Sequence, residues 1–136
     1  MAPQQFQLKT RRRSEFIDIT SSVAGAVGTS GVADGVCTVY VPHTTAGVTI
    51  NENADPSVVR DMIAHLEHLV PADGPYTHAE GNSDSHIKAG LMGSSVTVPI
   101  ATGRPLLGTW QGIYFCEFDG PRTRSYVVTV VGGAQD

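Results

Sequence analysis

The sequence predicts an α+β fold that is mainly β: an antiparallel β-sandwich with about three short helices, in a single domain spanning residues 1–136. Several runs rich in β-branched residues alternate polar and apolar side chains, which is the period of half-buried strands. The helical stretches fall early and do not alternate regularly with strands, as they would in a parallel α/β sheet. The length suits one hydrophobic core and is too short to divide into two.

The first elements are extended. Ranges 4–9 and 15–19 alternate polar and apolar residues and are expected to pair as an opening hairpin, with three arginines at 11–13 forming its tip. These arginines either steer an anionic ligand or protect an exposed sheet edge. A hydroxyl residue then caps a short helix over 20–27, which ends at the glycine-rich stretch 28–35.

The middle of the chain combines strands with an amphipathic helix. Range 36–41 is a strand, and 47–50 is another extended segment. Asp55 followed by Pro56 is a strong helix start, and apolar residues recur at helical spacing from there to residue 70. His65 and His68 on this helix fit either a metal-binding pair or an ordinary solvated face.

The second half begins with a polar loop at 71–83 and is expected to close as a β-meander. Asp84 is expected to cap a short helix at 85–92, which leaves through Gly93. Strands at 95–100, 106–108, 109–118 and 124–131 then form an antiparallel meander.

Composition narrows the classes of partner. With 16% charged residues and a net charge of -4, the chain has no general nucleic-acid surface. It has no run of roughly 20 apolar residues to make a membrane helix, and its start is too polar for a signal peptide, so a cytoplasmic location is expected. Cys37 and Cys116 lie in strand-like runs and are interpreted as buried thiols, with a disulfide left open.

Three histidines outside the amphipathic helix are candidate metal ligands: His43, His78 and His86. Imidazole binds zinc and other transition metals, and three imidazoles that leave an open position form a catalytic arrangement. The spacing matches no standard zinc signature. Polar neighbours of each histidine can act as ligands or orient the rings, although capping and loop solubility explain them as well.

Acidic and basic residues elsewhere are candidates for substrate handling. Glu52 has no evident structural duty and is a candidate base, ligand or anchor. Glu117 shares strand parity with apolar neighbours, so it points inward and needs a partner, either Arg122 or Arg124. Arginine is also the natural bidentate ligand of phosphate. The chain has no Walker or dinucleotide glycine pattern, which disfavours the nucleotide-binding classes.

Three long motifs carry a resemblance to a known family. They are HTTAGVTINENADP from His43 to Pro56, YTHAEGNSDSHIKAGLMGSS from Tyr76 to Ser95, and GTWQGIYFCEFDGPR from Gly108 to Arg122. Together they resemble the YjbQ-like family, often called secondary thiamine-phosphate synthases, over nearly the whole chain. The resemblance implies a β-sandwich-like homotrimer with sites near subunit boundaries, in which His43, His78 and His86 share one metal site.

The resemblance also implies an activity on a small phosphorylated substrate. Family members are credited with joining hydroxymethylpyrimidine diphosphate to thiazole phosphate, which gives thiamine phosphate and diphosphate. For that reaction, a divalent metal and Arg122 or Lys88 are assigned to the leaving diphosphate, and Glu52, Asp84 and Glu117 to orientation.

The identity of the metal and the type of function have alternatives. Histidine ligands favour zinc or another transition metal, whereas diphosphate chemistry ordinarily uses magnesium with oxygen ligands. The alternative functions are a non-catalytic trimer that binds a metal or an anionic metabolite, and a metal-dependent hydrolase on the same scaffold.

Overall fold

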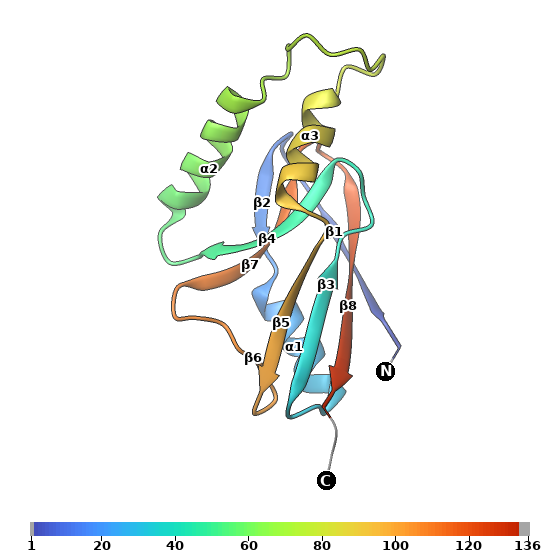
Figure 1. Cartoon of the computed structure of the whole chain (residues 1–136), viewed down its shortest axis with the longest axis vertical. Helices are drawn as coiled ribbons and strands as arrows, with labels where there is room; N and C mark the ends of the chain where they lie inside the picture. Colours follow the sequence, from blue (N-terminus) through green and yellow to red (C-terminus); the bar gives the residue numbers. More distant parts are fainter. Residues whose placement is uncertain (1, 134–136) are drawn as a thin grey trace.

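The computed structural model describes residues 2–133, which form two antiparallel sheets and three helices (Figure 1). The elements in chain order are β1 (Gln4–Lys9), β2 (Glu15–Asp18), α1 (Thr20–Ser30), β3 (Gly35–Tyr40), β4 (Ala46–Glu52), α2 (Pro56–Leu69), α3 (Ser83–Met92), β5 (Ser95–Ala101), β6 (Arg104–Pro105), β7 (Gln111–Glu117) and β8 (Thr123–Gly132). The larger sheet has the order β1-β8-β3-β5-β6 and the smaller one β2-β7-β4. The predicted α+β, mainly β class is confirmed.

The predicted strand pairing is wrong at both ends of the chain. β1 pairs with β8 and β2 pairs with β7, so the first two strands belong to different sheets and form no hairpin. The closing strands form no meander either, because β7 joins the small sheet while β5 and β8 join the large one. Residues 106–108 lie outside the strands, and the short strand there is Arg104–Pro105. Polar and apolar alternation defines the faces of a strand but not its neighbours.

The main core lies between the two sheets. Val39 and Val128 of the large sheet and Val48 and Phe115 of the small sheet are almost completely buried in one cluster. α1 adds its own buried valines and runs three residues beyond the predicted end, to Ser30, before Gly31 takes the left-handed conformation that ends it. The two cysteines are free and buried, as predicted.

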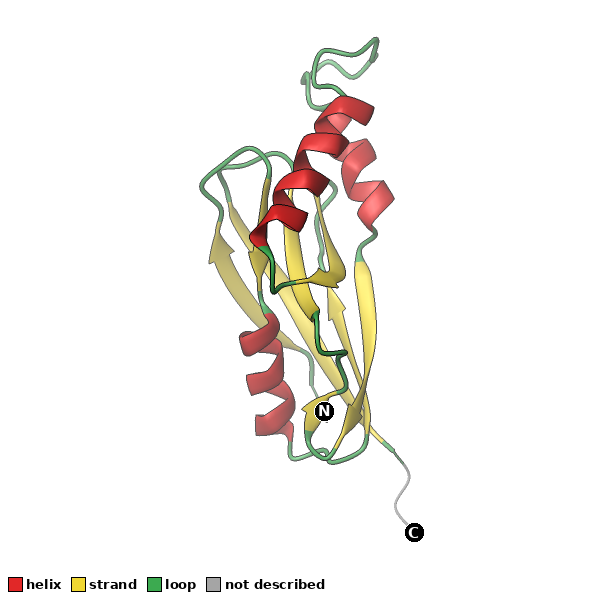
Figure 2. Cartoon of the chain, turned by 90° about the vertical axis from the view of Figure 1, so that its left-hand side faces the viewer, coloured by secondary structure: helices red, strands yellow, loops and turns green. Residues whose placement is uncertain are grey.

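The other two helices lie side by side at the opposite end from α1 (Figures 1 and 2). The carboxylate of Asp55 accepts a hydrogen bond from the amide of Ser57 at 2.9 Å, which confirms the predicted start of α2. α3 begins at Ser83, earlier than predicted, so Asp84 lies in its first turn and is not its cap. Within residues 2–133, no helix has both the length and the apolar character needed to span a membrane.

Candidate functional site

Three adjoining hollows open where the β3–β4 connection meets α3 and the loop before it. The histidine hollow has a volume of about 350 Å³, and its lining includes His78, Glu80, Asn82, His86, Arg122 and Arg124. The strand-edge hollow, about 430 Å³, is lined by His43, Thr44, Ser94 and Arg124 together with residues 40–42. A third hollow of about 320 Å³ contains both His43 and His86. Thr44 lines all three, so they adjoin one another at this residue, and together they are called the depression around Thr44.

Two of the predicted histidines lie together. The ring centroids of His78, on the loop before α3, and His86, in α3, are 5.3 Å apart in an edge-to-face arrangement. Nε2 of His78 is 3.8 Å from a carboxylate oxygen of the largely exposed Glu80. The loop and the helix therefore bring both imidazoles into the histidine hollow.

The third histidine has a different environment. β3 ends at Tyr40. Beyond this strand end the ring of His43 lies against β8, with its Nε2 3.0 Å from the amide nitrogen of Ser125. Burial and the nearby Arg124 guanidinium lower the pKa of His43. The lowered pKa favours the neutral ring, which lies against the backbone of β8.

The side chains of one chain do not supply all the ligands of a metal site. Residues 2–133 contain no group of three histidine, cysteine, aspartate or glutamate side chains placed to hold a metal ion. His78 and His86, with Glu80 nearby, could supply part of a coordination shell, and the other ligands would come from water, substrate oxygens or a neighbouring subunit. The shared three-histidine site stays a prediction.

Glu117 holds a buried arginine beside the hollows. Its carboxylate accepts hydrogen bonds from Nε of Arg124 at 2.8 Å and from the hydroxyl of Thr10 at 2.7 Å, and it also pairs with Nη2 of Arg124. Burial acts to raise the pKa of Glu117, but these hydrogen bonds outweigh it and lower the pKa. Of the two predicted partners, the structure selects Arg124. Because Glu117 has no exposed surface, it positions that guanidinium and does not contact a ligand itself.

Arg122 lies at the rim of the histidine hollow, with about half of its side chain exposed. Its Nη2 is 3.0 Å from Oδ2 of Asp119, and its Nε donates to the Asp119 carbonyl at 2.8 Å. Asn82 donates to the same carboxylate at 2.9 Å. The guanidinium is thus oriented on one side while its Nη1 makes no hydrogen bond to residues 2–133.

The predicted roles of Asp84 and Lys88 in contacting substrate are not supported, because both side chains are fully buried. The Lys88 ammonium is 3.0 Å from Asp84 and 2.7 Å from Glu67, and Arg13 makes two hydrogen bonds to Asp84 at 2.9 and 3.0 Å. This cluster joins the β1–β2 connection to α2 and α3. One residue of the arginine run therefore has a structural role.

Glu52 is also not brought to the hollows. It ends β4, six residues beyond Ala46, which lines the third hollow. At about 3.4 Å per strand residue, that separation is roughly 20 Å. The prediction that Glu52 orients substrate at this site is therefore not supported within one chain.

Arg124 is the site residue that sequence reasoning considered only as an ion-pair partner. It lines both the histidine and the strand-edge hollows although only 6% of it is exposed. The sequence did carry a signal for this residue, because in β8 Arg124 lies on the same face as the buried Tyr126, Val128 and Val130. Burying an unpaired charge is costly, so an arginine on this inward face needs a specific role.

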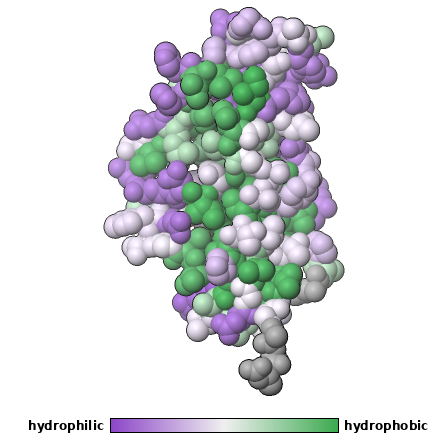
Figure 3. All heavy atoms as spheres, viewed as in Figure 1, coloured by the Kyte–Doolittle hydropathy of each residue, from purple (hydrophilic) through white to green (hydrophobic). Residues whose placement is uncertain are grey.

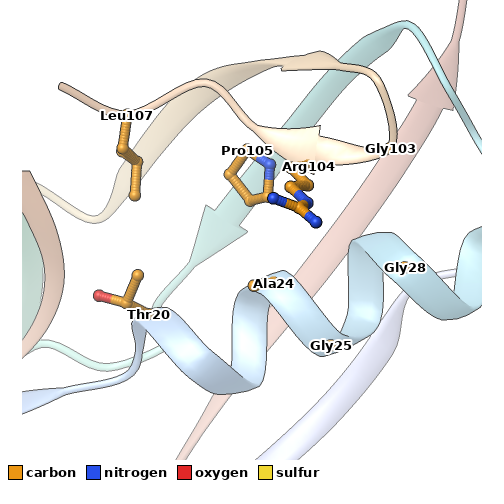
Figure 4. A pocket seen from close by; sticks show the side chains of 8 residues that line it. All are labelled: Thr20, Ala24, Gly25, Gly28, Gly103, Arg104, Pro105 and Leu107. Atoms are coloured by element: carbon orange, nitrogen blue, oxygen red, sulfur yellow. The ribbon is translucent and has the colours of Figure 1, made fainter. Parts of the chain in front are cut away.

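A separate hollow of about 500 Å³ lies between α1 and the β5–β6 turn (Figure 4). Its lining is mainly small and apolar residues, with Arg104 as the single charged side chain among those that line it. It lies at the far end of the molecule from α3 (Figure 1) and contains none of the histidines. The concentration of polar side chains favours the three hollows around Thr44 as the functional site.

Fold and site together define a class: a two-sheet α+β protein with an open depression lined by histidines and arginines. Residues 4–133 match the family model described as "UPF0047 protein YjbQ-like", and the chain belongs to this family. A UPF0047 protein of Methanocaldococcus jannaschii is 56% identical over 128 residues, covering 94% of this chain and 93% of the relative. The UPF0047 protein YugU of Bacillus subtilis is 48% identical, covering 93% and 96%.

Solved structures agree with this assignment. A YjbQ/UPF0047-family protein of Clostridium acetobutylicum, described as uncharacterized, has a TM-score of 0.93 at 55% identity and covers 94% of this chain and 99% of its own. A hypothetical protein from Aeropyrum pernix also has a TM-score of 0.93, at 38% identity, with 98% and 100% covered. None of these names states a biochemical activity, so the comparisons establish the family and the fold.

Proposed function

We propose that the depression around Thr44 binds and converts a small phosphorylated substrate, with thiamine phosphate formation as the candidate reaction. The observation that carries this proposal is the pair of arginines in the histidine hollow. Arg124 is held by the carboxylate of Glu117 through Nε and Nη2, and Arg122 by the carbonyl oxygen of Asp119 through Nε and by its carboxylate through Nη2. In each guanidinium the Nη1 group makes no hydrogen bond to residues 2–133. Oriented guanidinium donors of this kind suit phosphate oxygens.

The candidate reaction places clear demands on this hollow. The thiazole nitrogen attacks the methylene carbon of hydroxymethylpyrimidine diphosphate with its lone pair, a C–N bond forms, and the C–O bond breaks. The electron pair of that bond leaves with the diphosphate, and no proton has to move. The enzyme must therefore align the two reactants and stabilise the negative charge of the departing diphosphate.

The side chains of the histidine hollow can supply that stabilisation. Arg122 and Arg124 line this hollow and would offer their free Nη1 groups to the diphosphate, and His78 and His86 would add imidazole donors. A divalent metal held in part by these two histidines would add further positive charge. Because the cations are fixed before substrate arrives, little reorganisation is needed as charge develops.

The test is direct turnover. Purified protein is incubated with hydroxymethylpyrimidine diphosphate and thiazole phosphate, with no added metal or with Mg²⁺, Mn²⁺ or Zn²⁺, and thiamine phosphate and diphosphate are both quantified. Arg122→Ala is expected to lower the rate about a hundredfold, the typical effect of removing one charge-stabilising donor. Arg60→Ala, which removes an exposed arginine from α2, is the matched control and should retain the wild-type rate.

Each outcome has a definite meaning. Formation of thiamine phosphate with equal release of diphosphate supports the synthase. Diphosphate release without thiamine phosphate indicates a hydrolase on the same scaffold. If the substrates raise the melting temperature but no product forms with any metal, the protein is a binding module and the enzymatic proposal is wrong.

We also propose that the chain assembles as a homotrimer, with the outer face of the large sheet as a contact surface. On this face Val36 lies opposite Val131, and Tyr40 lies opposite Val127. Val36, Tyr40 and Val131 are 40%, 48% and 56% exposed, and the face shows few strongly hydrophilic side chains over β3, β5 and β8 (Figure 3). Uncharged β-branched and aromatic surfaces of this kind suit burial between subunits.

The assembly can be measured by sedimentation equilibrium. The expected mass is three times that of the chain, and Val131→Asp should shift the population toward monomer. Asp34→Asn, a change at an exposed residue of the turn before β3, is the control. A monomeric wild-type protein at micromolar concentration would contradict the proposal.

A further inference from the structure

The strand-edge hollow has a chemical character different from that of the histidine hollow beside it. Its polar side chains are those of Tyr40, His43, Thr44, Ser94 and Arg124, and no acidic side chain is among the described residues that line it. The histidine hollow, by contrast, contains Glu80 and Asp119. The two hollows share Thr44 and Arg124, so a ligand in one lies next to a ligand in the other.

Arg124 offers a free donor from a buried position. Its Nε and Nη2 are occupied by Glu117 and Thr45, whereas Nη1 has no hydrogen-bond partner within residues 2–133. Within those residues, Oδ1 of Asn82 is the one side-chain nitrogen or oxygen that is buried from solvent and has no hydrogen-bond partner. Nη1 of Arg124 also has no partner but is not in this class, so it is not buried from solvent. Nη1 of Arg124 therefore contacts the solvent in the hollows, although only 6% of the residue as a whole is exposed.

His43 offers a second donor. The amide of Ser125 donates to Nε2 at 3.0 Å, while the Ser125 carbonyl lies 3.1 Å from the same nitrogen. A backbone N–H without an acceptor is rarer in proteins than a carbonyl that lacks one of its partners, so Nε2 accepts from the amide. In the neutral ring the proton then resides on Nδ1, which is a donor and has no lone pair for a metal.

The hydroxyl groups complete the set. Those of Thr44 and Ser94 have no hydrogen-bond partner within residues 2–133, and hydroxyls readily turn their protons toward an acceptor. One guanidinium N–H, one imidazole N–H and two hydroxyls thus border a single hollow, and its only charged side chain is a cation. Such a set complements a phosphate group, because it combines one positive charge with several N–H and O–H donors.

We propose that the strand-edge hollow is a phosphate subsite that holds the phosphomonoester of a second ligand, with His43 as a hydrogen-bond donor to it and not as a metal ligand. Its place in catalysis rests on the proposed function. There it would hold the phosphorylated acceptor while the neighbouring hollow holds the diphosphate donor. Phosphate binding itself does not depend on that reaction.

The test uses inorganic phosphate as the probe and the full-length protein. Isothermal titration calorimetry should show binding to the wild type and about tenfold weaker binding to His43→Ala, the loss expected for one hydrogen bond to a charged group. Because Arg124 variants also break a buried ion pair, the second variant is Thr44→Val/Ser94→Ala, which removes only hydroxyls and should weaken binding several-fold. Arg60→Ala, which removes an exposed arginine of α2 that lines neither hollow, should change the phosphate affinity less than twofold.

A spectroscopic measurement tests the role of His43 separately. Two-bond ¹H–¹⁵N spectra of ¹⁵N-labelled protein should show His43 protonated on Nδ1, and phosphate should shift that Nδ1 resonance. Protonation on Nε2, no phosphate binding by the wild type, or a loss of binding in Arg122→Ala but not in His43→Ala would each overturn the subsite. Intact phosphate binding without thiamine phosphate formation would refute only the proposed reaction.

Discussion

Replacing Asp84 with asparagine should destabilise the protein strongly at neutral pH and much less in acid. Asp84 is fully buried between Lys88 and Arg13. Burial acts to raise its pKa, but hydrogen bonds from Arg13 and Lys88 outweigh burial and lower the pKa from 3.8 to about 2. At 1.36 kcal/mol per unit, that difference corresponds to about 2.4 kcal/mol of folding free energy carried by the ionised group.

The pH dependence follows from the direction of this shift. Since the pKa is lower in the folded protein than in the unfolded chain, the stabilisation is complete well above pH 3.8 and declines as the pH falls toward 2. About half of it should be lost by pH 3. The asparagine variant cannot ionise, so the difference in unfolding free energy between wild type and Asp84→Asn should narrow over the same interval.

Urea denaturation between pH 7 and pH 3 measures this difference. The expected destabilisation is about 2–3 kcal/mol at pH 7, the magnitude that the pKa difference of Asp84 gives. Asp61→Asn on the exposed side of α2 is the control and should stay within about 0.5 kcal/mol. A destabilisation by Asp84→Asn that is the same at pH 7 and pH 3 would show that the ionised carboxylate is not what stabilises the cluster.

Three further substitutions test the fold around the site. Glu117→Gln removes the anionic partner of buried Arg124 and should lower the unfolding free energy by about 3–5 kcal/mol in urea titrations, with wild-type stability as the contradicting result. Gly47→Ala would place a Cβ 2.6 Å from the carbonyl oxygen of Gly93, so the melting temperature should fall; no change would mean that β4 and the end of α3 separate easily. Phe115→Ala empties the centre of the main core and should cost about 3–5 kcal/mol by chemical denaturation, and a loss below 1 kcal/mol would indicate that the core collapses around the gap.

Several local features were predictable because they depend on neighbours in sequence. The alternation in residues 4–9 matches β1, and the Asp55–Pro56 start of α2 depends on a carboxylate two residues from the amide that it caps. Strand parity correctly indicated that Glu117 points inward and needs a cation. The family motifs identified the loops that line the site.

What the sequence by itself determined is therefore the class of fold, the positions of most elements, the family, and the histidine- and arginine-bearing segments. Only the tertiary structure decided which strands pair, that Asp84 and Lys88 are sealed in an ion cluster, and that Arg124 and His43 face a common hollow. The physical reason is that periodicity and capping act within a few residues, whereas pairing, burial and shared cavities depend on segments far apart in the chain. The Ser125 amide that fixes the His43 ring is 82 residues away from it in the chain.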